Sequence, residues 1–76
     1  MNAQDRKQID TIISELEGLL EQVRELSDAE REKFDNLNEG LQASERGQAF
    51  EQAADALENA TTAIEEAISG LEEAKG

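Results

Sequence analysis

The sequence predicts an all-α protein: an antiparallel two-helix hairpin that dimerises into a four-helix bundle. Two observations carry this prediction. Apolar residues recur at alternating steps of three and four over two long stretches, and the only segment dense in turn formers lies between these stretches. Such steps keep residues on one side of an α-helix, whereas a strand alternates with a period of two. We expect one domain over residues 1–76, with helices at about 4–36 and 45–74 and a turn at about 37–44.

The first helix is predicted by apolar residues at helical spacing: Ile9, Ile12, Ile13, Leu16, Leu19, Leu20, Val23 and Leu26. Around Ser27 two interpretations compete. Ser27 followed by Glu30 matches a capping box, which would begin a new helix. Against this, charges alternate in sign past the same point, which supports an unbroken helix: Glu21, Arg24, Asp28, Arg31 and Asp35. Because no Gly or Pro lies in this stretch, we favour one continuous helix.

The turn formers are concentrated in the segment Asp35–Ser44. Asn36, Asn38 and Gly40 can each take a left-handed conformation and end a helix. Ser44 is the expected N-cap of the second helix, because its side chain can accept a hydrogen bond from the first turn.

The turn also carries candidate binding residues, Glu39 and Arg46. Arg46 has two interpretations: it ties to a nearby carboxylate, or it belongs to a recognition tip, since binding residues often lie on loops held by rigid elements. Leu37 and Leu41 are apolar within the turn, and we expect them to fold over the end of the bundle.

The second helix carries two adjacent apolar series. The small series consists of Ala49, Ala53, Ala56, Ala60, Ala63, Ala67, Gly70 and Ala74, and the large series of Phe50, Ala54, Leu57, Thr61, Ile64, Ile68 and Leu71. Together they are wider than the seam between two helices. We therefore expect an oligomer interface, most simply in a homodimer, made of Ala49, Phe50, Ala53, Ala56, Leu57, Ala60, Ala63, Ile64, Ala67, Ile68 and Leu71.

The composition limits the classes of function and of binding partner that the chain can have. A chain of 76 residues is near the size at which a single core is marginal, and it contains no cysteine, so association is the expected remedy. A net charge of −12 argues against direct binding to nucleic acid or to an anionic membrane. No membrane span or signal peptide is expected, and the predicted location is the cytoplasm.

Catalysis is not expected. The chain has no Cys or His, so it lacks the usual nucleophile–base pairs and the Glu-x-x-His ligands of di-iron bundles. The turn does not match an EF-hand, because counting from Asp35 places Leu37 at position three and Arg46 at position twelve. We therefore predict no cofactor, no metal and no catalytic residue.

The most regular polar feature is an acidic row on the second helix. Glu51, Glu58, Glu65 and Glu72 recur every seventh residue, flanked by Asp55, Glu66 and Glu73. The row is either a solvated face or a docking surface for a basic protein partner, such as a nucleic-acid-binding protein whose groove it mimics. B-DNA carries about one charge per 1.7 Å. A −12 chain about 45 Å long carries about one per 4 Å, and a dimer about one per 2 Å.

Three segments around the turn carry a resemblance: Glu32–Leu37, Glu39–Gln42 and Ser44–Gly47. With the Ala-rich second helix they resemble small acidic helical proteins of phages and prophages, a largely uncharacterised group. The turn of that group often has Pro where Asn38 stands here. The resemblance implies a cytoplasmic accessory protein of a phage in its host cell. Such proteins often bind and block host machinery, including defence systems. The alternative is a structural or scaffold subunit of a larger assembly.

Overall fold

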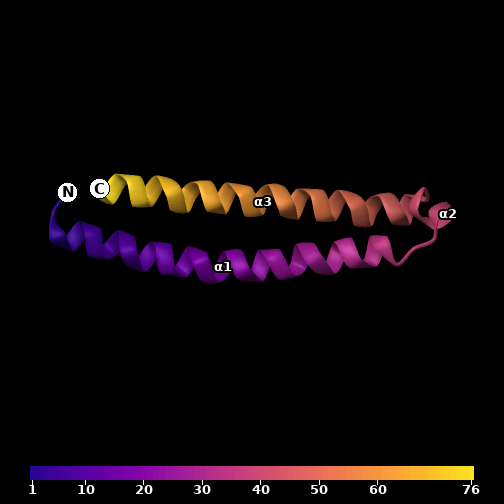
Figure 1. Ribbon diagram of the computed structural model, residues 1–76, viewed down its shortest axis with the longest axis horizontal. Helices are drawn as coiled ribbons and strands as arrows, with labels where there is room; N and C mark the ends of the chain where they lie inside the picture. Colours follow the sequence, from indigo (N-terminus) through magenta and orange to yellow (C-terminus); the bar gives the residue numbers. More distant parts are fainter.

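The protein consists of two long helices and one short helix, with no strand. In the computed structural model, which describes all 76 residues, α1 spans Ala3–Asp35, α2 spans Glu39–Gln42 and α3 spans Glu45–Lys75. Figure 1 shows α1 and α3 side by side and antiparallel, with both termini at one end and α2 at the other. The molecule measures 58 × 15 × 13 Å. The all-α prediction is confirmed, and the structure adds a helix, α2, within the segment predicted as a turn.

Helix α1 begins two residues before the first carboxylate in its sequence. Asn2 is the N-cap, and its Oδ1 accepts a hydrogen bond of 2.7 Å from the Asp5 backbone N–H, which satisfies one of the free amides at the helix start. The helix then continues without a break past Ser27 to Asp35. Of the two interpretations at Ser27, the structure therefore has the continuous helix, and the Ser27 side chain is buried between the helices instead of capping one.

The core is a single seam between α1 and α3. Ile9, Ile13 and Leu20 of α1 and Ala54 of α3 are buried. The other inward side chains are only half-buried: Leu16, Val23 and Phe34 of α1, and Phe50, Leu57, Thr61, Ile64, Ile68 and Leu71 of α3. Two helices alone cover each inward side chain from one direction only, so most of the seam keeps contact with water.

The turn is ordered by side-chain caps. The Leu41 N–H donates to Asn38 Oδ1 at 3.0 Å at the start of α2, and the Gly47 N–H donates to Ser44 Oγ at 3.2 Å at the start of α3. The Ser44 cap is thus confirmed. Asn36, Asn38 and Gly40, each of which can take a left-handed conformation, do not take it here, because Gly76 alone has a positive φ. Asn36 ends α1 with φ −77°.

Gly47 is required by a close approach of backbones. A Cβ built on Gly47 would lie 2.5 Å from the Gln42 carbonyl oxygen and would also collide with the Leu41 carbonyl oxygen. Such a contact cannot be relieved by a rotamer change, because the opposing atoms belong to the main chain. The glycine in Ser-Glu-Arg-Gly therefore lets α2 pack against the first turn of α3.

Candidate functional site

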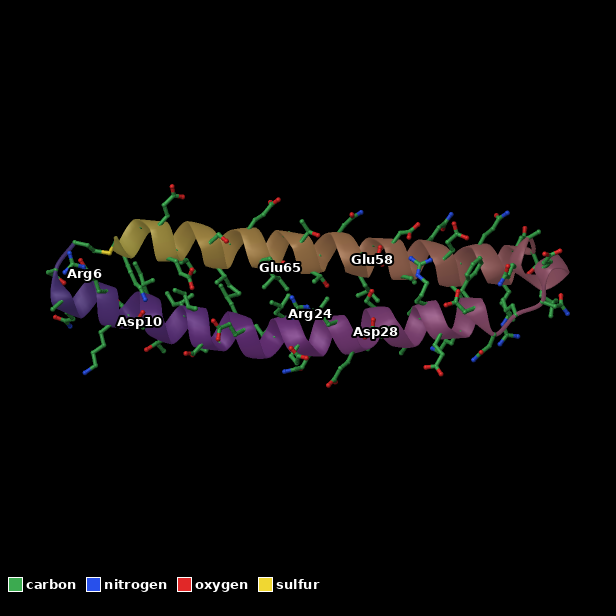
Figure 2. All side chains as sticks on the ribbon, viewed as in Figure 1. Arg6, Asp10, Arg24, Asp28, Glu58 and Glu65 are labelled. Atoms are coloured by element: carbon green, nitrogen blue, oxygen red, sulfur yellow. The ribbon has the colours of Figure 1, made fainter.

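One side of the α1–α3 seam is lined by ion pairs, and we call it the charged flank: Arg24, Arg31, Asp55, Glu58 and Glu65. Arg24 Nη2 lies 3.4 Å from Glu65 Oε1. Arg31 Nη2 lies 2.8 Å from Asp55 Oδ1 and 3.8 Å from Glu58 Oε1. Figure 2 shows Arg24, Glu58 and Glu65 on the facing sides of α1 and α3.

These ion pairs also identify the opposite side of the seam. Arg24 follows the inward Val23, and Glu65 follows the inward Ile64. Along a helix, the residue after an inward residue and the residue before it lie on opposite edges of the inward stripe. The residues that directly follow inward residues meet at the charged flank. The residues that directly precede inward residues, on both helices, therefore lie together on the other flank.

On that other flank lies a mostly apolar surface, which we call the apolar face. By the same rule Glu15 and Lys33, which precede the inward Leu16 and Phe34, lie on its α1 side. From α1 it contains Ile12, Leu19 and Leu26, with exposed fractions of 42, 51 and 57%. From α3 it contains the small series, Ala49, Ala53, Ala56, Ala60, Ala63, Ala67, Gly70 and Ala74, all exposed except the half-exposed Ala53. Large exposed apolar side chains that share one flank are typical of a surface that another molecule covers.

The predicted oligomer interface therefore divides into two parts. Its small members lie on the apolar face. Its large members Phe50, Leu57, Ile64, Ile68 and Leu71 lie in the seam against α1. The prediction also missed Ile12, Leu19 and Leu26. Their seven-residue spacing, one position before the inward residues of α1, is the signal that could have found them.

Some of the predicted acidic docking residues are in ion pairs and others are not. Asp55, Glu58 and Glu65 are in ion pairs with arginines of α1. Glu51, Glu66, Glu72 and Glu73 are exposed and in no salt bridge within 4.0 Å, and the same holds for Glu39 in the turn. The row is thus neutralised in its middle and unpaired toward its ends.

Two cations on this rod have perturbed titration. The hydrogen bond from Arg31 to Asp55, helped by the charges of Asp55 and Glu58, raises the pKa of Arg31 above its ordinary value. At the end that holds both termini, the hydrogen bond of 2.5 Å from Lys75 Nζ to Asp10 Oδ1 raises the pKa of Lys75. Both shifts favour the charged form, so these cations stay protonated across the physiological pH range.

The seam opens on the charged flank into one shallow polar depression, lined by Arg24, Ser27, Asp28, Glu58, Thr61 and Thr62. No hydrophobic residue lines it, whereas small-molecule sites are predominantly apolar. Thr61 Oγ1 donates to the Leu57 carbonyl at 2.9 Å, and no buried side-chain nitrogen or oxygen lacks a partner. The depression is therefore a polar opening in the seam and lacks the apolar lining of a small-molecule site.

At the tip, two cations lie near one aromatic ring. Arg46 stacks over the Phe50 ring, with Cζ 5.8 Å from the ring centroid, and Lys33 Nζ lies 5.9 Å from the same centroid. Arg46 thus makes a cation–π contact and none of the ion pairs considered for it. Leu37 is half-buried, but Leu41 remains 51% exposed, so the expectation that it folds over the bundle end is wrong.

No group of three or more His, Cys, Asp or Glu side chains is arranged to hold a metal ion. None of the helices combines the length and the apolar character that crossing a membrane requires. No protein-family model, curated protein or solved structure matches the chain.

Proposed function

We propose that the chain is a non-enzymatic protein-binding module, a helical hairpin that dimerises through the apolar face into a four-helix bundle. We further propose that it is a phage-encoded protein that acts in the host cytoplasm by binding and inhibiting a basic host protein, such as a component of a defence system. The resemblance around the turn supports the phage origin.

The observation that carries this proposal is the separation of charge and apolar surface onto opposite flanks of one rod. A chain with net charge −12 and 34% charged residues keeps its α3 small series free of charge from Ala49 to Ala74, and places Ile12, Leu19 and Leu26 on the same flank. A helix whose outward positions are only solvated does not need an unbroken uncharged series along its whole length, as α3 has from Ala49 to Ala74. A surface kept apolar beside so many carboxylates is better explained by a partner that covers it.

The exposed area supports a dimer. A compact protein of 8.3 kDa is expected to expose about 4,600 Å², whereas this rod exposes 5460 Å². The difference is about 900 Å², and a standard interface buries about 800 Å² per partner. Covering the apolar face with a second copy would therefore bring the area close to that of a compact protein.

The carboxylates outside the ion pairs supply the attraction for a basic partner. A net charge of −12 over 58 Å corresponds to about one charge per 5 Å, and in a dimer to about one per 2.4 Å, close to the 1.7 Å of B-DNA. A dimer of this charge density could mimic nucleic acid toward a protein that binds it. Long-range attraction of this kind accelerates association and weakens as salt is added.

The test is capture from a host lysate, followed by binding of the purified partner at low and high salt. Glu66→Gln with Glu73→Gln removes two unpaired charges, and we expect a lower affinity and a shallower salt dependence. Glu58→Gln with Glu65→Gln is the matched control, because these carboxylates already face arginines. If both double variants bind like the unmodified protein, the acidic row is only a solvated face.

The scaffold alternative makes a different prediction. A scaffold subunit would form assemblies that grow with protein concentration, whereas an inhibitor remains a small closed oligomer. Sedimentation over a hundredfold range of concentration separates the two. Growth beyond the dimer would favour the scaffold and contradict the proposed inhibitor.

A further inference from the structure

The two helices contribute side chains of opposite size to the apolar face. On this face the apolar side chains of α1 are Ile12, Leu19 and Leu26, which are large, and α3 offers Ala and Gly alone. The charged residues of α1 on this flank, Glu15 and Lys33, have long side chains too. The inference that follows rests on the proposed dimer and concerns how its two copies are arranged.

A symmetric pair of hairpins can stack on this face in two ways. With the two-fold axis along the rod, the two turns lie at the same end and each α1 packs on the partner subunit's α3. With the two-fold axis across the rod, the turns lie at opposite ends, so that α1 packs on α1 and α3 on α3. The first stacking places large residues against small ones, whereas the second places large against large and small against small.

We propose that a second copy of this chain covers the apolar face in the first arrangement, with turn beside turn. The ion pairs within one chain set the register. Leu26 lies between Arg24 and Arg31, which pair with Glu65 and Glu58, so Leu26 is level with the part of α3 around Ala60 and Ala63. Rotation about a two-fold axis along the rod does not change the position of any residue along the rod, so each residue of the second copy lies at the same level as in the first. Leu26 therefore packs against the partner subunit's Ala60 and Ala63.

The size match holds at all three large apolar side chains of α1. By the same register, Leu19 lies level with Ala67 of the partner subunit and Ile12 with Ala74 of the partner subunit, so every large side chain meets a small one. All helix pairs then keep a similar separation, as close packing of bundles requires. The full 58 Å of the two copies can overlap in either arrangement, so the excess of about 900 Å² over a compact protein of this mass supports the dimer, and the size match selects the arrangement. In the second arrangement, facing leucines would hold the α1 helices apart while the alanines leave a gap between the α3 helices.

Single-cysteine chains test the arrangement, since the protein has no cysteine of its own. We would mix Leu26→Cys with Ala60→Cys chains, and separately Leu26→Cys with Ile12→Cys chains, and follow disulfide formation by mass spectrometry. Association holds facing thiols at an effective concentration near mM. We therefore expect the Leu26→Cys and Ala60→Cys mixture to cross-link at least about tenfold faster than the same mixture unfolded in guanidinium, and the second mixture to show no acceleration.

The opposite pattern, with rapid linkage only in the Leu26→Cys and Ile12→Cys mixture, would overturn this arrangement and leave the dimer intact. No acceleration in either mixture, with dimers still seen by light scattering, would also overturn the arrangement. A monomer at every concentration would overturn the proposed dimer itself.

A compensating pair of substitutions gives an independent readout without cysteine. Ala60 is exposed in the single chain, so Ala60→Leu should leave the helices folded while crowding Leu26 of the partner subunit. We expect Ala60→Leu to weaken the dimer and the added Leu26→Ala change to restore at least part of the loss. If the double variant is weaker than Ala60→Leu alone, the two positions do not face each other.

Discussion

Replacing Leu19 by Ala is expected to weaken the dimer selectively. Leu19 is 51% exposed in the single chain, so about half of its side chain remains to be buried by a partner. Full burial of a leucine contributes about 1.5–3 kcal/mol, and half of this is about 1 kcal/mol. A symmetric dimer contains the residue twice, which gives a loss of about 2 kcal/mol and a dissociation constant about 30-fold higher.

Leu41→Ala is the matched control for this prediction. Leu41 is also 51% exposed, but it belongs to α2 and lies outside the apolar face. Sedimentation equilibrium of both variants over a range of concentrations gives the two dissociation constants, and circular dichroism checks that the helices remain. An unchanged dissociation constant for Leu19→Ala, or an equal loss for Leu41→Ala, would refute the reasoning.

Three further predictions concern the single chain. Gly47→Ala should lower the thermal midpoint by overpacking, at a cost of about 1–3 kcal/mol, because its Cβ would meet the Gln42 carbonyl. A Cβ at Gly18 would meet nothing within 4 Å. Gly18→Ala should therefore increase the free energy of unfolding by up to about 1 kcal/mol and raise the thermal midpoint. A gain at Gly47 would show that α2 is not packed against α3. In hydrogen exchange, amides over Leu26–Glu30 should exchange more slowly than those near Gly40. Equal rates would contradict a continuous α1.

The helices were predictable from the sequence because their signals are local. Apolar residues at steps of three and four define α1 and α3, and Ser44 ahead of Glu45 marks the start of α3. The short α2 was not predicted. Its N-cap, Asn38, is of a residue type that can either begin or end a helix. From the sequence we considered Asn38 only as a residue that ends a helix.

The candidate surfaces were predictable only in part, because they depend on which of two adjacent apolar series faces α1. Periodicity places both series on one side of α3 and does not rank them. The structure turns the large series inward, where it buries more area, and leaves the small series on the flank with Leu19. The pairing of Arg24 with Glu65 joins residues 41 positions apart, and a helical period contains no information on such contacts.

The central claim, that the apolar face is covered by a second copy, is tested most directly by light scattering coupled to size exclusion. The chain has a mass of 8.3 kDa, so a dimer has twice 8.3, or 16.6 kDa. We expect the dimer mass for the unmodified protein and a shift toward 8.3 kDa for Leu19→Ala on dilution. A constant 8.3 kDa for the unmodified protein at every concentration would contradict the account.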